Sequence, residues 1–130
     1  MDVQKLYKFK LNVLVVDDEK ELTYILQKIL ELKGSNVFIA HDGEEALSIY
    51  SSHPNYFDLI ISDSLMPKMG GEELFKKVEE INYDKKPICL LTSGGGPNFN
   101  SSAVNGFIEK PFSRKDIREK LLHFFKAEVL

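Results

Sequence analysis

The sequence predicts an α/β fold in which helices cover both faces of a parallel sheet. Short apolar runs, which are typical of strands buried on both sides, alternate with amphipathic segments that have helical spacing. The connections between these segments are short, and this alternation is the pattern of a doubly wound sheet. With 130 residues, of which 43% are hydrophobic, the chain has the size and composition of one domain with its own core.

The first half of the chain contains two strand–helix units. We expect a strand over 11–16 (LNVLVV) and then a helix over 20–33, where Leu and Ile recur at the i, i+3, i+4, i+7 spacing. A short strand follows over 36–40. Asp42, with Glu45 three residues later, is expected to cap the second helix.

The second half continues the alternation. We expect strands over 57–63, 88–91 and 106–109, and a helix over 72–81 that presents its apolar residues on one side. Ser113 begins a capping-box pattern that predicts a last helix.

One segment breaks the alternation. Residues 93–102 (SGGGPNFNSS) are rich in Gly, Asn and Ser, which are poor helix formers. The helix that should connect the last two strands is therefore expected to be short or missing.

Composition excludes several functional classes. The net charge is −3 and there is no run of basic residues, which disfavours direct binding to nucleic acid. Neither a signal peptide nor a run of membrane-spanning length is found, so we expect a cytoplasmic protein without membrane insertion. The single cysteine, Cys89, lies in an apolar segment and is expected to be a buried, inert thiol.

Polar residues follow four of the predicted strands. Asp17 and Asp18 follow the first strand, Asp63 ends the third, Thr92 follows the fourth and Lys110 follows the fifth. Parallel strands present their carboxyl ends at one edge of the sheet, where ligands bind. We therefore expect all five side chains to meet.

Three carboxylates at one edge repel one another unless a cation joins them, and Mg²⁺ is the cation that fits oxygen ligands of this kind. One carboxylate could then attack phosphorus, with Mg²⁺, Lys110 and Thr92 compensating the charge on the phosphoryl oxygens. Ordinary explanations also exist: acids favour helix starts, Thr92 could be a turn residue and Lys110 a solvated lysine. The combination of five such residues at four strand ends favours an aspartyl phosphate site.

Five segments together carry a family resemblance. VLVVDDE, AHDGEEAL, DLIISDSLMPKMGG, LLTS and FIEKPF resemble the receiver domain of response regulators in two-component signalling, including single-domain chemotaxis regulators. The resemblance covers about residues 11–126. It implies a flavodoxin-like, five-stranded parallel sheet in the order 2-1-3-4-5, the strand order of a chemotaxis member of the family. Residues 11–130 would then form the receiver domain after an N-terminal lead of residues 1–10.

The resemblance also implies roles for individual residues. Asp63 would accept a phosphoryl group from a sensor histidine kinase or a phosphotransfer protein and become 4-aspartylphosphate. Mg²⁺ would be held by Asp63, by Asp18 directly, by Asp17 through water and by the backbone carbonyl of Leu65. Lys110 would contact the phosphoryl group, and no further cofactor is implied.

Two further residues would respond to phosphorylation. Thr92 would move toward the phosphoryl group, and Phe107 would turn inward as an aromatic switch, although plain core packing is an equal explanation for Phe107. The Lys110–Pro111 peptide bond is expected to be cis.

The sequence departs from the family between the fourth and fifth strands. Thr92 and Lys110 are 18 positions apart, about one helical turn fewer than the family leads us to expect. The missing residues fall in the 93–102 segment, and the fourth helix of the family helps to form its usual output and dimerisation surface. In the same segment, Gly94 has no side chain to cover the phosphoryl group, so we expect water to reach it readily.

These features support a stand-alone, phosphorylatable receiver that acts on a separate downstream protein. The alternative is a pseudo-receiver or adaptor that binds partners without a phosphorylation cycle, which the altered segment over 93–105 favours. An aspartate-dependent phosphatase would need a second acid and a substrate-binding cap, and neither is visible. A flavin-binding domain of similar topology has no specific support. We therefore expect no enzyme activity beyond the protein's own phosphoryl transfer and dephosphorylation.

Overall fold

The computed structural model describes residues 7–96 and 98–129, and its centre is a parallel sheet of five strands. The strands are β2 (Asn12–Val16), β3 (Asn36–Ala40), β4 (Leu59–Asp63), β5 (Ile88–Ser93) and β6 (Gly106–Glu109). They lie in the order β3-β2-β4-β5-β6, and every neighbouring pair is parallel. Counted along the chain within this sheet, the order is 2-1-3-4-5, which confirms the predicted topology.

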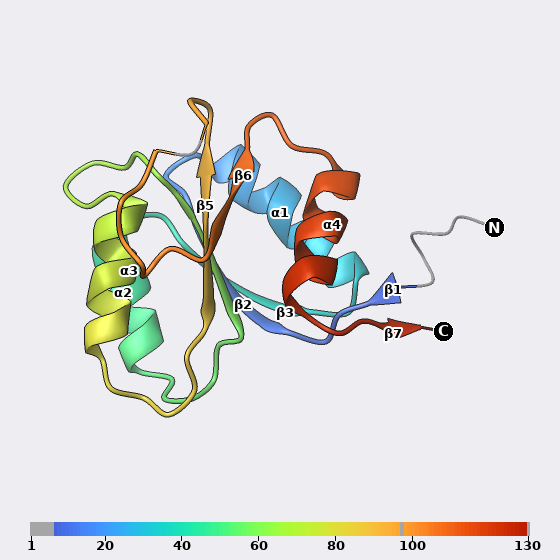
Figure 1. The fold of residues 1–130 in the computed structure, drawn as a ribbon, viewed down its shortest axis with the longest axis horizontal. Helices are drawn as coiled ribbons and strands as arrows, with labels where there is room; N and C mark the ends of the chain where they lie inside the picture. Colours follow the sequence, from blue (N-terminus) through green and yellow to red (C-terminus); the bar gives the residue numbers. More distant parts are fainter. Residues whose placement is uncertain (1–6, 97, 130) are drawn as a thin grey trace.

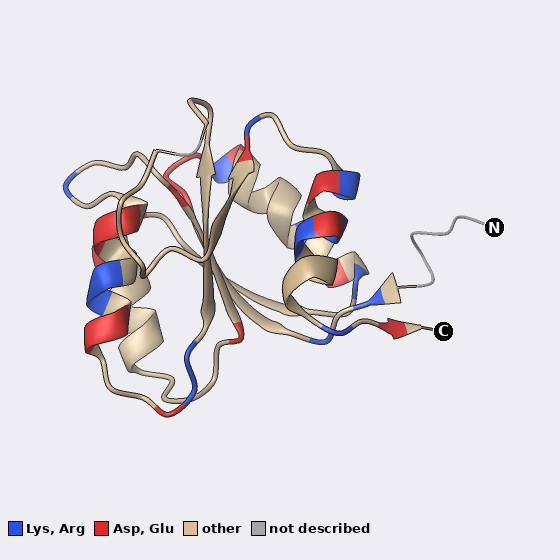
Figure 2. Cartoon of the chain, in the orientation of Figure 1, with Lys and Arg blue, Asp and Glu red and all other residues tan. Residues whose placement is uncertain are grey.

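In the described residues, four helices cover the two faces of the sheet (Figure 1). On one face lie α1 (Lys20–Leu32) and α4 (Arg114–Phe124), and on the other lie α2 (Gly43–Ser51) and α3 (Gly71–Glu80). No helix in the described part of the chain has the length and apolar content needed to cross a bilayer. Acidic and basic residues alternate along α3 and α4 (Figure 2).

The strands are apolar throughout because both faces of the sheet are buried. Successive side chains of a strand point to opposite faces. In β2, Val13 and Val15 pack with α1 and α4, whereas Leu14 and Val16 pack with α2 and α3. All five residues of β4 are buried, which explains the continuous apolar run that leads to Asp63.

Two predicted helix starts are confirmed. The Asp42 carboxylate accepts a hydrogen bond from the Glu45 amide at 2.7 Å and caps α2. Ser113 and Asp116 form the reciprocal capping box at the start of α4. The sequence placed the start of the third strand at residue 57, but β4 begins at Leu59.

The helix predicted to be short or missing is absent: described residues 94–96 and 98–105 contain no helix. Instead, Phe99 packs against the core and Ala103 and Val104 are buried. Two hydrogen bonds then join Asn105 to Cys89. The Asn105 amide donates to the Cys89 carbonyl at 2.8 Å, and the Cys89 amide donates to Asn105 Oδ1 at 2.7 Å. An irregular segment therefore covers this part of the sheet, and Cys89 is buried as predicted.

A second, two-stranded sheet joins the two ends of the described chain. In it, β1 (Tyr7–Lys8) pairs antiparallel with β7 (Glu128–Val129). Beside it Phe9, which is only 1% exposed, accepts a hydrogen bond at its carbonyl from the Ser35 hydroxyl. The structure thus places residues 7–10 of the predicted N-terminal lead against the domain. Residues 1–6 of that lead lie outside the described residues.

Candidate functional site

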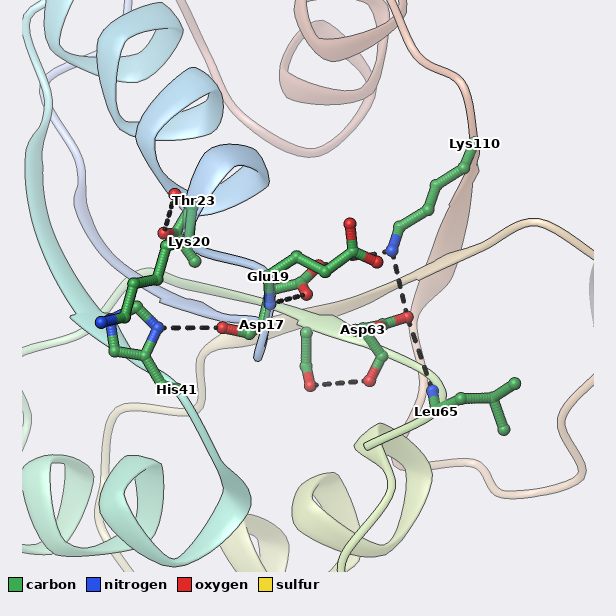
Figure 3. Close-up of polar contacts among 9 residues, drawn as sticks. Asp17, Glu19, Lys20, Thr23, His41, Asp63, Leu65 and Lys110 are labelled. Carbon is green, nitrogen blue, oxygen red and sulfur yellow. Dashed lines mark hydrogen bonds and ion pairs between the residues drawn. The ribbon is translucent and has the colours of Figure 1, made fainter. Parts of the chain in front are cut away.

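The parallel register brings the predicted polar residues to one edge of the sheet. Asp63 lies opposite Thr92 in the pairing of β4 with β5. Asp17 directly follows β2, and the Lys110 amide, directly after β6, donates to the Ser93 carbonyl at 2.8 Å. Figure 3 shows Asp17, Asp63 and Lys110 converging from three chain segments, as the sequence predicted. Thr92 adjoins Asp63 in the register of the sheet.

Three carboxylates form the centre of the site. Asp17, Asp18 and Asp63 each offer an oxygen, and these oxygens all lie within 4.8 Å of one another. Asp17 is 2% exposed and Asp63 is 8% exposed, whereas Asp18 is exposed. The cluster is thus reachable from solvent on the Asp18 side.

Lys110 is the cation of the cluster. Its Nζ lies 3.3 Å from Asp17 Oδ2 and 3.3 Å from Asp63 Oδ1 (Figure 3). These two aspartates are supplied by different strands, so the lysine connects β6 to β2 and β4. One ammonium group offsets only one of the three carboxylate charges.

Burial and neighbouring charges have opposing effects on the pKa values of Asp17 and Lys110. Burial raises the pKa of Asp17, and the Glu19 amide and the Lys110 ammonium oppose this effect only in part. Burial alone would lower the pKa of Lys110, but the Asp17 and Asp63 carboxylates outweigh it and raise that pKa. Lys110 is therefore firmly cationic, whereas the carboxylates are crowded enough to favour an added cation.

The donor set fits Mg²⁺, which takes few carboxylates together with water and phosphate oxygens. Asp17, Asp18 and Asp63 offer only oxygen atoms, and their excess negative charge is what a divalent ion would neutralise. The Leu65 side chain is 82% exposed, and its amide lies 3.5 Å from Asp63 Oδ1. That contact places the Leu65 backbone beside the site, and the metal-binding role of its carbonyl remains a prediction.

The loop after Asp63 is held by close backbone contacts that the sequence did not reveal. The Ser64 amide donates to the Thr92 carbonyl at 2.9 Å, and the Gly71 amide donates to the Ser64 carbonyl at 3.2 Å. A Cβ at Gly71 would lie 2.5 Å from both the Asp63 carbonyl oxygen and Leu91 Cδ2. Gly71 therefore provides a close approach, where a side chain would displace the backbone of the site.

His41 contacts the backbone of the site, which the sequence did not indicate. Its Nδ1 lies 3.1 Å from the Asp17 carbonyl oxygen (Figure 3). A carbonyl only accepts, so Nδ1 carries the proton in this contact. The ring thereby supports the backbone just before Asp18, and no spacing rule links the two positions.

Thr92 and Phe107 lie on the two strands that flank the altered segment. Thr92 is 1% exposed and directly adjoins Asp63 in the sheet. Phe107 is half-buried, packs against the core and has the Lys120 ammonium 5.7 Å from its ring centroid. The Lys110–Pro111 peptide bond is cis, as predicted.

The family described as response regulator receiver domain matches residues 13–122. The chain belongs to the response regulator receiver family. Receiver domains of two-component systems take phosphoryl groups from histidine kinases onto an aspartate, and they typically bind Mg²⁺. The cluster of Asp17, Asp18 and Asp63 in this receiver domain could hold a metal ion.

Known proteins of several kinds resemble this receiver domain. The transcriptional regulatory protein CpxR of Escherichia coli (strain K12) is 32% identical over 110 residues, which are 82% of this chain and 45% of CpxR. The autoinducer 2 sensor kinase/phosphatase LuxQ of Vibrio vulnificus (strain YJ016) is 31% identical over 125 residues, or 93% of this chain and 14% of LuxQ. The chain thus spans less than half the length of these curated relatives.

Solved structures of similar length share the fold. The chemotaxis response regulator CheY4 of Vibrio cholerae superposes with a TM-score of 0.80 at 28% identity, covering 90% of this chain and all of CheY4. The receiver domain of the hybrid histidine kinase CckA superposes with a TM-score of 0.76 at 30% identity, covering 88% of this chain and 99% of the CckA domain. The flavodoxin-like fold predicted from sequence is confirmed by these similarities.

Proposed function

We propose that this protein is a stand-alone receiver that accepts a phosphoryl group on Asp63 and signals by contact with a separate downstream protein in the cytoplasm. The donor is a sensor histidine kinase or a phosphotransfer protein. The observation that carries the proposal is the placement of Lys110, 3.3 Å from Asp63, beside an acid cluster that suits Mg²⁺.

Asp63 acts as the nucleophile. As an oxygen of its carboxylate forms the bond to phosphorus, the bond between phosphorus and the donor nitrogen breaks, and that nitrogen keeps the electron pair. Lys110 and the Thr92 hydroxyl stabilise negative charge on the phosphoryl oxygens. Asp63, Asp18 and the Leu65 carbonyl would hold Mg²⁺ directly and Asp17 would hold it through water, and the ion would supply the remaining charge compensation.

Phosphorylation then changes the contacts of Lys110, Thr92 and Phe107. In the unphosphorylated protein Lys110 connects Asp17 and Asp63. A phosphoryl group on Asp63 offers Lys110 a more highly charged partner, and Thr92, its neighbour in the sheet, turns its hydroxyl toward the same group. Phe107 moves into the space beside Thr92, which alters the surface near β6. The protein acts on no other substrate and catalyses only its own phosphorylation and dephosphorylation.

A pseudo-receiver or adaptor is the second candidate, because described residues 94–96 and 98–105 do not form the helix that normally contributes to the output surface. The decisive experiment incubates the protein with Mg²⁺ and acetyl phosphate and measures phosphorylated protein by intact mass. We expect uptake by the wild type and by Asp84→Asn, in which an exposed acid far from the cluster is replaced, and none by Asp63→Asn. Absence of uptake in the wild type with several small phosphodonors would favour the adaptor.

A further inference from the structure

Lys120 of α4 lies over the ring of Phe107 on β6. The distance from Lys120 Nζ to the ring centroid is 5.7 Å, within the range of a cation–π contact. Both residues border a hollow of about 470 Å³ between β6 and α4, which Lys110, Asp116 and Glu119 also line. The contact therefore connects the last helix to the strand that ends at Lys110.

The acids near Lys120 are engaged elsewhere. Asp116 lies four residues before Lys120, a spacing at which ion pairs form on a helix, but its carboxylate accepts the Ser113 amide at 2.8 Å in the capping box. Glu119 is paired with Lys115 at 3.8 Å. In the described part of the chain no carboxylate lies within ion-pair distance of Lys120. The ammonium group is therefore left to the aromatic ring.

The side chain of Phe107 can form no hydrogen bond that would fix the position of its ring. A phenylalanine has no hydroxyl, so its ring position depends on packing and on what contacts its face. The ring is half-buried and packs on one side against the core cluster that includes Leu91, its partner in the sheet. On the α4 side, Lys120 supplies a directional contact that favours the observed position.

We propose that Lys120 is a positioning residue that holds the Phe107 ring beside the hollow between β6 and α4 and so limits how readily the ring turns inward when Asp63 is phosphorylated. The inference rests on the proposed function, because it concerns the regulation of the same site. A cation–π contact at a partly exposed position corresponds to about a two- to fivefold change in an equilibrium. Loss of the contact shifts the ring toward the inward position by that factor.

Two substitutions of Lys120 and one matched control test this role. Lys120→Gln removes the charge, Lys120→Arg keeps it, and Arg114→Gln removes an exposed charge at the start of the same helix without freeing Glu119 from Lys115. NMR of protein labelled at phenylalanine follows the ring signals of Phe107, which are assigned by their loss in Phe107→Leu. Phosphorylation by acetyl phosphate with Mg²⁺ is measured on the same set.

We expect Lys120→Gln to shift the Phe107 ring signals before any phosphodonor is added and to raise the phosphorylation rate about two- to fivefold. Lys120→Arg and Arg114→Gln should behave as the wild type. In the Phe107→Leu background, which lacks an aromatic face, Lys120→Gln should have no effect on the rate.

Unchanged ring signals in Lys120→Gln would overturn the inference, as would an equal rate increase in Arg114→Gln or in the Phe107→Leu background. Failure of the proposed function would give a different result, because the wild type would then take up no phosphoryl group. The ring signals of the unphosphorylated protein would still decide whether Lys120 positions Phe107.

Discussion

Magnesium should stabilise this protein, and the acid cluster should account for the effect. Asp17 and Asp63 are buried beside Asp18, and their oxygens lie within 4.8 Å of one another. At that separation two carboxylates repel each other by about 1 to 3 kcal/mol for an effective dielectric constant between 80 and 20. Lys110 offsets part of this repulsion, so the ion-free native state carries a strain that a divalent cation removes.

The size of the stabilisation follows from mass action. A ligand that binds only the native state, present at ten times its dissociation constant, adds about 1.4 kcal/mol to the free energy of unfolding. For a domain of this length, that corresponds to a rise in Tm of about 5 °C. The measurement is thermal unfolding followed by circular dichroism, in MgCl₂ and in EDTA with NaCl added to equal ionic strength.

Asp18→Asn is the informative variant, because Asp18 is exposed and its replacement leaves the contacts of Lys110 with Asp17 and Asp63 in place. We expect it to lose most of the Mg²⁺-dependent rise in Tm and to be slightly more stable than the wild type in EDTA. Asp84→Asn, an exposed acid outside the cluster, should respond as the wild type does. An equal rise in NaCl, or an undiminished response of Asp18→Asn, would refute the reasoning.

The pH dependence of the ion-free protein has a definite sign. Burial raises the pKa of Asp17 above its ordinary value of 3.8, so the native state binds this proton more tightly than the unfolded state. Stability from this group therefore falls as the pH rises from about 3.8 through the native pKa, and it is constant above. Mg²⁺ favours the ionised carboxylate, so the rise in Tm with Mg²⁺ should shrink as the pH is lowered through the same window.

Three further predictions concern single residues. A Cβ at Gly94 meets nothing within 4 Å, so Gly94→Phe should fold normally, shield the phosphoryl group from water and slow the release of phosphate from phosphorylated protein; an unchanged rate would contradict this idea. Gly71→Ala should lower the free energy of urea unfolding by about 1 to 3 kcal/mol, because its Cβ would press on the Asp63 backbone, while Gly95→Ala, which meets open space, should not. Burial raises the pKa of Cys89 from 9.0 to about 12, so the thiol ionises at lower pH in the unfolded chain than in the native protein. Above pH 9.0 the free energy of unfolding of the wild type should therefore fall by about 1.4 kcal/mol per pH unit relative to that of Cys89→Ala. An equal pH dependence of unfolding in the two proteins would refute this assignment.

The gap left by the fourth helix shows how a sequence can predict an absence but not what replaces it. Gly, Asn and Ser in 93–102 indicated that a helix would not form, and none is found in described residues 94–96 and 98–105. The path of the segment depends on contacts with distant residues. The Asn100 amide donates to the Glu72 carboxylate of α3 at 3.1 Å, and Asn105 pairs with Cys89 on β5.

The sequence by itself determined the alternation of strands and helices and the residues of the candidate site. Apolar runs and helical spacing are local patterns, and parallel strands place Asp17, Asp63, Thr92 and Lys110 at one edge without further information. The resemblance to receivers added the strand order and the cis bond before Pro111. These expectations are confirmed by the topology, the register and the backbone geometry.

Only the tertiary structure decided which side chains contact one another. Lys110 connects Asp17 and Asp63 because the directions of three side chains from different strands converge, which spacing along the chain does not encode. The pairing of β1 with β7 involves two residues on each strand, too few to produce a periodic pattern. Lys120 contacts Phe107 because capping and ion pairing engage the nearby acids, and that competition exists only once α4 is folded against β6.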